Sequence, residues 1–275
     1  MAYRKVDEAS LTAVADSIRE KGGTTGALAF PDGFVSAVQA IQAGGGETDS
    51  SLKDIIERTA VNPTLPSDLT KIGDYAFYYY SNLALTSLPD GVTSIGSNAF
   101  RNCTNLKLTS LPDGVTSIGS YAFYNCANME ITSLPDGVTS IGNTAFYGCT
   151  SIALTSIPDG MTSINNYAFY NCKNMALTSL PDGVTSIGEY AFYLCSKLAL
   201  TSLPGKLTSI GGRAFGNCSN LQTVTFEETP SSISGDAFYN CTNLKTINVP
   251  WAEGAVANAP WGATKATINY NYTGE

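Results

Sequence analysis

The stretch "LPDGVTSIGSYAFYNCANMEITS", from Leu111 to Ser133, decides the fold because near-copies of it fill most of the chain. Its Ala-Phe pair recurs every 23 residues, with the phenylalanine at Phe77, Phe100, Phe123, Phe146, Phe169, Phe192, Phe215 and Phe238. A cysteine stands three residues after each of the last seven, and these are all the cysteines of the 275-residue chain. A period of this length with fixed apolar positions is typical of a solenoid, in which stacked units share one continuous core.

Each unit is predicted to contain a short strand and an arc that returns the chain to the next strand. The apolar slots of the quoted unit, which other units fill with similar residues, are Leu111, Val115, Ile118, Ala122, Phe123, Cys126, Met129 and Ile131. The Pro-Asp-Gly triplet predicts a turn, because Pro presets φ, Asp caps the turn and Gly accepts a positive φ. Gly119 and its equivalents predict a second bend. We expect strands one repeat apart to pair in parallel.

The repeated unit resembles the BspA-like branch of the leucine-rich repeat family. The resemblance covers about residues 65 to 249 and rests on eight copies in register. It implies an α/β repeat fold, namely a right-handed leucine-rich-repeat solenoid with short parallel strands. It also implies a surface-binding or adhesion protein, of a kind common in bacteria of the gut and mouth and found in some protists and among phage-encoded proteins.

One segment departs from the family pattern. In "NLKLTSLP", Leu108 and Leu111 are three residues apart, so a flat strand cannot point both side chains inward. Either the strand carries a bulge, or one column forms an exposed apolar ladder on the concave face. That column is Leu85, Leu108, Ile131, Leu154, Leu177 and Leu200. An exposed line of this kind would be a contact surface, so Leu108, Ile131, Leu154 and Leu177 are candidate ligand-binding residues.

The ends of the chain are not built from the repeat. Residues 1–43 are predicted to form a small helical module, residues 44–51 a Gly-rich linker, residues 52–250 the solenoid with its N-terminal cap, and residues 251–275 a C-terminal cap. Trp251 and Trp261 are large enough to cover the last open turn. The segment from Val6 to Ile41 is similar to N-terminal segments of phage tail-associated proteins of Gram-positive bacteria. The resemblance implies attachment to phage tail proteins through residues 1–43; alternatively, these helices fold back as an N-terminal cap.

Composition excludes several functions. Apolar residues make up 43% of the chain and charged residues 14%, and the formal net charge is −8, which argues against nucleic acid or anionic membranes as partners. No run of apolar residues is long enough to span a membrane, so we expect no membrane insertion. The N-terminus lacks the apolar segment of a secretory signal, which predicts folding in a cytoplasm. The absence of histidine removes His-based nucleophilic sites and His-bearing metal sites.

The cysteine and aspartate columns are best explained by structure. Seven cysteines in one column point the same way, and no CxxC pair exists, so we expect reduced cysteines in the core. The exposed turns carry Asp90, Asp113, Asp136, Asp159 and Asp182. Their carboxylates could hold calcium, but turn formation explains them better. No aspartate differs from its neighbours as a catalytic pair requires, so we predict no enzyme, no cofactor and no metal site.

Tyrosine is the most distinctive candidate for binding. Ten of the 15 tyrosines fall in two columns: Tyr78, Tyr124, Tyr147, Tyr170, Tyr193 and Tyr239 directly after the phenylalanine, and Tyr75, Tyr121, Tyr167 and Tyr190 two residues before it. The core slots here belong to Ala, Phe and Cys, so at least one tyrosine column should be partly exposed. Arg101, Asn98, Thr144 and Arg213 replace tyrosine in some repeats, which favours exposure. Tyrosine is common in binding surfaces; the alternative is that the rings only stack between repeats. Eight of these tyrosines are candidate ligand-binding residues: Tyr78, Tyr121, Tyr124, Tyr147, Tyr167, Tyr170, Tyr190 and Tyr193.

A second predicted ladder consists of asparagine. Its members are Asn105, Asn128, Asn174, Asn220 and Asn243, and we expect their amides to lie inside the solenoid and to bond backbone groups of neighbouring turns.

These features predict a binding protein, with three alternatives for its biology. The first is a phage or prophage tail-associated receptor-binding protein, located in the virion after cytoplasmic folding. The second is a BspA-like adhesin on a bacterial cell surface. The third is an architectural virion protein without a ligand. The partner of the first two is a protein or glycan on a bacterial or host cell surface.

Overall fold

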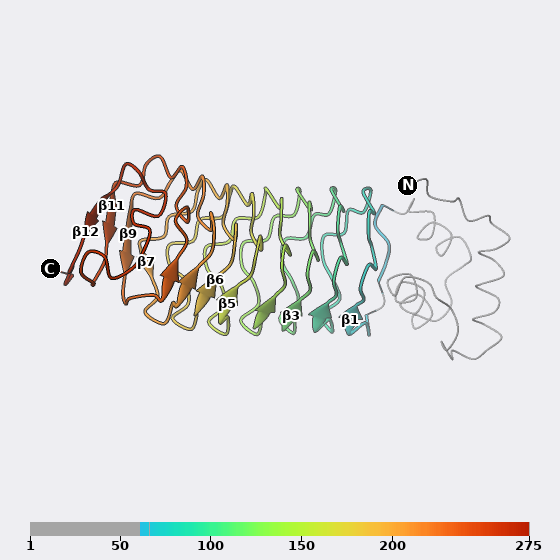
Figure 1. Ribbon diagram of the computed structural model, residues 1–275. Helices are drawn as coiled ribbons and strands as arrows, with labels where there is room; N and C mark the ends of the chain where they lie inside the picture. The colour runs from blue at the N-terminus through green and yellow to red at the C-terminus, as the bar shows by residue number, and fades with distance from the viewer. Residues whose placement is uncertain (1–60, 66, 275) are drawn as a thin grey trace, which may run out of the picture. The chain divides into compact units, whose positions relative to one another are not determined.

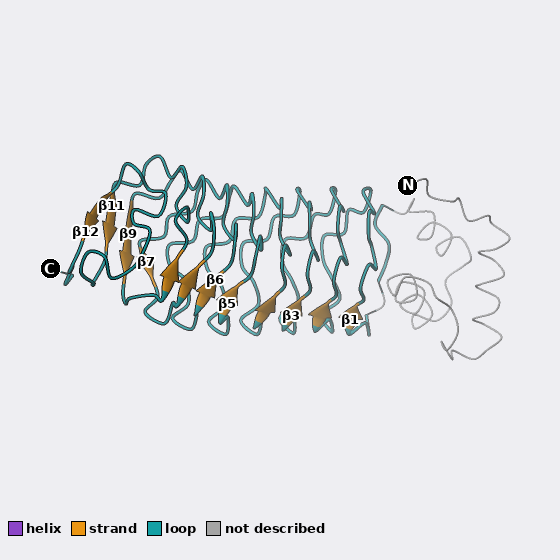
Figure 2. Ribbon diagram, in the orientation of Figure 1, coloured by secondary structure: helices purple, strands orange, loops and turns teal. Residues whose placement is uncertain are grey.

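The computed structural model describes residues 61–65 and 67–274, all within one compact unit. The predicted helical module, the linker and the segment Leu52–Thr59 lie outside the described residues. The described part is a stack of similar turns built from short strands and loops, with no helix among them (Figures 1 and 2). The predicted repeat solenoid with parallel strands is therefore confirmed, but the α in α/β finds no support in the part of the chain that is described.

Eight of the strands occupy the same place in successive repeats, and each is two residues long. They are β1 (Lys71–Ile72), β2 (Ser94–Ile95), β3 (Ser117–Ile118), β4 (Ser140–Ile141), β5 (Ser163–Ile164), β6 (Ser186–Ile187), β8 (Ser209–Ile210) and β10 (Ser232–Ile233). They form two parallel sheets, in the orders β1-β2-β3-β4 and β5-β6-β8-β10. The isoleucine of each pair is buried and the residue before it faces outward, as the two-residue period of a strand requires.

A third sheet belongs to the C-terminal turns. It contains β7 (Ser202–Leu203), β9 (Thr223–Phe226), β11 (Thr246–Asn248) and β12 (Thr267–Asn269), paired in parallel in the order β7-β9-β11-β12. In β9, buried residues alternate with residues that face outward, whereas in β11 both Ile247 and Asn248 are buried. In Figure 1 this sheet lies at the C-terminal end of the solenoid. The strand expected around "LKLTSLP" is absent from the middle repeats. There the segment makes isolated backbone hydrogen bonds, such as Glu130 N to Leu108 O.

The predicted exposed apolar ladder is wrong. Leu108 is fully buried and Leu111 is 4% exposed, so both columns contribute to the core. Thr109 and Ser110 between them are both exposed, so the chain places two consecutive side chains outward and then returns to the core. The backbone therefore leaves the flat strand path, and Leu108, Ile131, Leu154 and Leu177 are core residues that no surface ligand can reach.

Aromatic and thiol columns fill the centre of the core. The phenylalanines from Phe77 to Phe238 stack on one another, with ring centroids 5.2–5.7 Å apart in successive repeats. All seven cysteines are buried, which confirms that they belong to the core. Each thiol donates to the carbonyl of a phenylalanine in the preceding repeat, as Cys126 Sγ does to Phe100 O at 3.0 Å.

The arcs are turns rather than helices because their amides bond to a neighbouring repeat. Tyr121 N, Phe123 N and Asn125 N donate to carbonyls in the next repeat, at 2.7–3.0 Å. Every second amide of the arc thus bonds to the next repeat, and this path requires two left-handed residues in each arc. Tyr121 and Asn125 are these residues here, with φ values of 58° and 57°. Asparagine tolerates this conformation better than most residues, which explains its frequency at the second position.

Glycine is required where successive turns touch. A Cβ atom added at Gly119 would lie 2.5 Å from Ser97 N, and the same approach recurs at Gly96, Gly142, Gly188 and Gly211. In each of these repeats the glycine amide donates to the isoleucine carbonyl one turn earlier. Asn165 occupies this slot in one repeat, and its side-chain Nδ2 donates to Ile141 O at 2.6 Å instead. The ladder is broken there, between β4 and β5.

Two tryptophans pack at the C-terminal end. Trp261 is fully buried and donates from Nε1 to Ala257 O at 2.7 Å. Its ring lies 6.3 Å from that of Trp251 and 6.1 Å from that of Phe226. Residues after the last repeat therefore cover the final turn with apolar surface, which a solenoid end needs.

The predicted interior asparagine ladder lies on the surface. Asn105, Asn128, Asn220 and Asn243 are exposed and Asn174 is half-buried. Several of these side chains nonetheless bond the preceding repeat, as Asn243 Nδ2 does with Ser219 O at 2.7 Å. The reason is that Leu106 and its equivalents already occupy the inward direction at the next position.

Candidate binding surface

The two tyrosine columns form one continuous surface strip, which we call the tyrosine strip. Its members are Tyr78, Arg101, Tyr121, Tyr124, Tyr147, Tyr167, Tyr170, Tyr190, Tyr193, Arg213 and Tyr239. The arcs hold it in place, because one column follows the buried phenylalanine and the other occupies the first left-handed position of each arc. The structure thus brings together all eight tyrosines predicted as ligand-binding candidates.

The rings of the strip stack face to face. Centroid distances are 4.7 Å for Tyr124–Tyr147, 4.3 Å for Tyr147–Tyr170 and 5.1 Å for Tyr170–Tyr193, with interplanar angles of 13°, 3° and 17°. Tyr193 then covers Gly216, where an added Cβ would lie 2.6 Å from its ring. Ring faces are therefore covered by neighbours, and most of the side chains are half-buried. The surface offers ring edges and phenol hydroxyl groups to a partner.

The exposure argument from the replaced positions was partly wrong. Asn98 and Thr144, which replace tyrosine in the left-handed column, are 8% and 7% exposed. They are short enough for neighbouring large side chains to cover them. Exposure is highest near the strip ends, at 43% for Tyr75 and 44% for Tyr239. Tyr79, which is 46% exposed and follows Tyr78 in the first repeat, was missed because it stands in an asparagine slot.

Arginines lie at both ends of the stacked tyrosines. The guanidinium carbon of Arg101 lies 4.8 Å from the ring centroid of Tyr124 and 5.0 Å from that of Tyr121, and the carbon of Arg213 lies 4.7 Å from that of Tyr239. Cation–π contacts of this kind stabilise the charged group over the ring. Both arginines stand in tyrosine slots of the repeat, and in the sequence they served only as evidence that these slots are exposed. Their contacts with the tyrosine rings were not predicted.

Two phenols of the strip and the carboxyl beside Arg213 have pKa values that differ from the ordinary ones. Burial raises the pKa of the Tyr147 phenol to about 12, and the neighbouring Tyr170 makes the next largest contribution to this rise. Burial and then Glu189 raise the pKa of Tyr167. For Asp236, burial acts upward, but hydrogen bonds from Ser234 and Arg213 hold the pKa of the carboxyl below its usual value. At neutral pH the phenols of Tyr147 and Tyr167 are therefore uncharged hydrogen-bond donors, and Asp236 is an anion.

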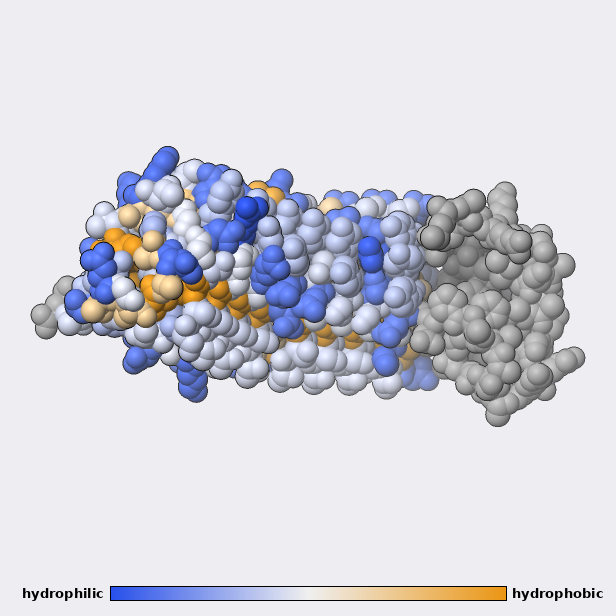
Figure 3. Space-filling model, viewed as in Figure 1, coloured by the Kyte–Doolittle hydropathy of each residue, from blue (hydrophilic) through white to orange (hydrophobic). Residues whose placement is uncertain are grey.

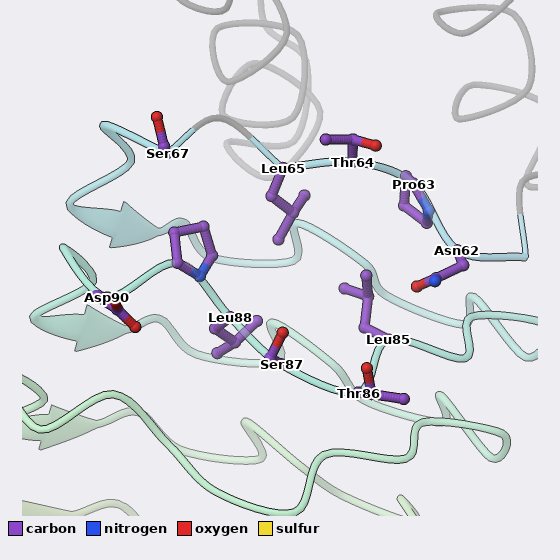
Figure 4. Close-up of a pocket in the computed structure, with 11 residues that line it drawn as sticks. Asn62, Pro63, Thr64, Leu65, Ser67, Leu85, Thr86, Ser87, Leu88 and Asp90 are labelled. Carbon is purple, nitrogen blue, oxygen red and sulfur yellow. The ribbon is translucent and has the colours of Figure 1, made fainter.

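The other side of each repeat carries little that could bind. Figure 3 shows an apolar band along the stacked turns, yet Val61 is the one large aliphatic side chain of the described residues that is exposed. A hollow of about 450 Å³ lies between the first two turns, where Leu65, Leu85 and Leu88 face one another (Figure 4). Among the described residues that line it, Asp90 is the one with a charged side chain, and these residues include no acid–base pair.

The aspartate turns are exposed and give no metal site. Asp90, Asp113, Asp136, Asp159 and Asp182 all lie on the surface. Within residues 61–65 and 67–274, no three Cys, Asp or Glu side chains gather closely enough to hold a metal ion. A search of the same residues finds no helix suited to crossing a membrane.

Comparisons with known proteins agree with this architecture. The profile of a BspA type leucine rich repeat region matches residues 59–176 and 141–254. A leucine-rich repeat protein from Bacteroides ovatus is 28% identical, with a TM-score of 0.56, over 78% of this chain and 61% of that one. A leucine rich cell surface protein from Faecalibacterium prausnitzii is 32% identical, with a TM-score of 0.53, over 66% of this chain and 59% of that one. The chain thus spans about three fifths of either relative, and no curated protein matches it.

Proposed function

Because the chain belongs to the family of proteins with a BspA type leucine rich repeat region, we propose that it is a non-catalytic recognition protein. It binds a protein on another surface through the tyrosine strip. The observation that carries the proposal is a row of stacked, half-buried tyrosines that is flanked by arginines. Repeat solenoids commonly use such extended surfaces to bind long partners.

The chemistry of the strip favours a protein partner over a glycan. Tyrosine and arginine are the residues most enriched at protein–protein interfaces and at their energetic hot spots. A sugar ring would need an exposed aromatic face, but the faces of Tyr147 and Tyr170 are covered by their neighbours. Ring edges and hydroxyl groups remain accessible, and they can contact the backbone and side chains of a polypeptide.

Binding to intact bacterial cells tests this proposal. We expect the double variant Tyr147→Ser/Tyr170→Ser to lose binding by at least about tenfold, since hot-spot residues each contribute 2 kcal/mol or more. The control is Thr109→Ala/Thr132→Ala, which alters two exposed residues outside the strip and should bind like the wild type. Equal binding by wild type and the tyrosine variant, both folded, would exclude the strip as the contact surface.

The carrier that displays the solenoid is the finer part of the proposal. The segment from Val6 to Ile41, which resembles phage tail-associated proteins, supports display on a phage or prophage tail. The printed name of the Faecalibacterium relative, a cell surface protein, supports the adhesin alternative. An architectural virion protein would carry the same fold but show no binding in the cell assay.

Electron microscopy distinguishes the two carriers. A gold-labelled antibody against the solenoid should decorate the tails of induced prophage particles if the first carrier is correct. It should decorate intact, unlysed cells, and leave purified particles unlabelled, if the adhesin alternative is correct. Label on particles combined with unchanged cell binding by the tyrosine variant would support the architectural alternative.

A further inference from the structure

The two arginines of the tyrosine strip differ in how their charge is balanced. Arg213 Nε lies 3.0 Å from Asp236 Oδ2, and its Nη1 donates to the Tyr190 hydroxyl group at 3.3 Å. The carboxylate of Asp236 is held in turn by Ser234 Oγ at 2.9 Å. Arg213 is thus an arginine of the strip that lies over a tyrosine ring and forms an ion pair with a carboxylate of the same chain.

Arg101 is in the same kind of setting without a carboxylate. Its guanidinium lies over the rings of Tyr121 and Tyr124, and Nη1 donates to the neutral Asn98 Oδ1 at 3.1 Å. The buried Nε has no acceptor within the described part of the chain, where no ion pair of Arg101 occurs either. A guanidinium has five N–H donors, so most of the donors of this half-buried cation have no acceptor among residues 61–65 and 67–274.

We propose that Arg101 is a binding site for the carboxylate of an aspartate or glutamate side chain of the protein partner. The inference rests on the proposed function, because it assumes a polypeptide lying along the tyrosine strip. The guanidinium is held by two rings and by Asn98, so its flat fork is oriented before the partner arrives. A fork in fixed orientation loses little freedom when it forms paired hydrogen bonds with a carboxylate.

The charge of the chain favours a single acidic side chain over a polyanion. A formal net charge of −8 repels nucleic acid, polyphosphate and heavily charged glycans. Arg101, which has no carboxylate partner among the described residues, attracts one carboxylate of the partner. The edges of the tyrosine rings make the remainder of the contact. The partner is therefore expected to present an acidic residue beside apolar or uncharged residues.

Selection from a library of short random peptides tests the site. Peptides selected on the full wild-type chain should be enriched in Asp or Glu. A selected peptide should bind Arg101→Gln about tenfold more weakly, because a hydrogen bond to a charged group is lost. Replacing the acidic residue of the peptide by its amide should cause the same loss with wild type and little further loss with Arg101→Gln. Arg101→Lys should recover only part of the affinity, because it restores the charge without the fork.

The chain offers a matched second variant. Asp236→Asn frees Arg213 from its internal carboxylate and should increase binding of acidic peptides, whereas Arg213→Gln should leave the Arg101-dependent affinity unchanged. Circular dichroism and thermal unfolding establish that each variant is folded.

Three results would overturn the inference. They are selected peptides without acidic enrichment, equal binding of acidic peptides by wild type and Arg101→Gln, and Arg101-dependent binding confined to glucuronic or sialic acid on a glycan array. If peptides bind, Tyr147→Ser/Tyr170→Ser abolishes their binding and Arg101→Gln does not, the proposed function stands and this inference fails. If peptides bind independently of the tyrosines, the proposed function fails as well.

Discussion

At the scale of the residue, the repeat is maintained by a few slots that each have one physical reason. Phe123 and Cys126 are specified by enclosed space, and Asn125 by a left-handed backbone. Gly119 is specified by contact with the preceding turn, where an added Cβ would lie 2.5 Å from Ser97 N. Two glycine-to-alanine substitutions can distinguish the close contact between turns at Gly119 from the effect that replacing any glycine has on stability.

Gly119→Ala should destabilise the protein by about 1–3 kcal/mol, the usual cost of forcing extra atoms into a packed site. Gly137→Ala is the matched control, because the nearest atom to its added Cβ is Val115 O at 3.7 Å. Urea denaturation of both variants measures the difference. A free energy of unfolding that falls equally in the two variants would exclude close approach as the reason for glycine at this slot.

The buried thiols predict a pH dependence of stability. Burial raises the pKa of the Cys195 and Cys241 thiols to about 12, and also raises the pKa of Cys126, Cys172 and Cys218. In the unfolded chain a thiol titrates near 8.5. As the pH rises above about 8.5, the unfolded chain releases protons that the folded chain retains, so the free energy of unfolding falls. Each thiol contributes about 1.4 kcal/mol per pH unit until its folded pKa is reached.

Urea denaturation at increasing alkaline pH, under reducing conditions, measures this slope. Cys195→Ala removes one titrating thiol and should make the slope shallower by about 1.4 kcal/mol per pH unit. The comparison with wild type cancels the titration of tyrosine and lysine. Superimposable slopes for the two proteins would show that the Cys195 thiol does not contribute to the alkaline loss of stability.

At the scale of the element, the ladder of two-residue strands depends on unbroken contact between turns. Between β4 and β5 this contact is lost where Asn165 takes the glycine slot. Thr139 N donates to Thr116 O and Thr185 N to Thr162 O, whereas Thr162 N makes no such bond with Thr139 in the described structure. The arcs of the same repeats remain bonded, for example Phe146 N to Ala168 O at 2.8 Å.

Asn165→Gly should therefore join the two sheets. We expect amide hydrogen exchange at Thr162 to slow by about tenfold, as a new backbone bond forms at a net gain near 1 kcal/mol. Asn143→Gly, one repeat earlier at an exposed position, is the control for the added chain flexibility of glycine. Exchange at Thr162 that is as fast in Asn165→Gly as in wild type would mean that the side chain at residue 165 is not what separates the turns.

At the scale of the whole molecule, each turn is stabilised mainly by its two neighbours, so the ends determine how the stack begins to unfold. The C-terminal end is closed by Trp261, which is fully buried and accepts a backbone bond from Phe238 N at 2.9 Å. A change at this end should act on the last turns before it acts on the middle of the solenoid.

Trp261→Ala should cost about 3–5 kcal/mol, as for other large aromatic residues removed from a core. We expect hydrogen exchange to rise first in residues after about Phe215 and last in the central repeats. Thr264→Ala, at an exposed position close by in the chain, should change neither quantity. Exchange that rises evenly along all repeats would show that the solenoid unfolds as one cooperative unit.

Much of this architecture was predictable from the sequence, and the errors have identifiable causes. The period, the core slots and the burial of the cysteines follow from a pattern that repeats in register. The strand was expected in "LKLTSLP" because this segment takes the place of the apolar alternation in the family pattern, whereas the residues that pair in the middle repeats are the two-residue Ser-Ile segments. The asparagine ladder was predicted to lie inside the solenoid because regular spacing does not show whether a side chain points to the core or to solvent. Arg101 and Arg213 were read only as signs of exposure, because their ring contacts depend on distances between repeats.

The sequence alone determined that this chain is a solenoid, because a period of 23 residues with fixed apolar slots has no other way to bury its apolar side. The tertiary structure alone decided which side chains reach solvent. Leu108 is buried because the backbone turns two residues outward after it. Within the described part of the chain, Arg101 donates to the neutral Asn98 and not to a carboxylate. Both facts depend on the path of the backbone and the spacing of neighbouring turns, which a one-dimensional pattern does not contain.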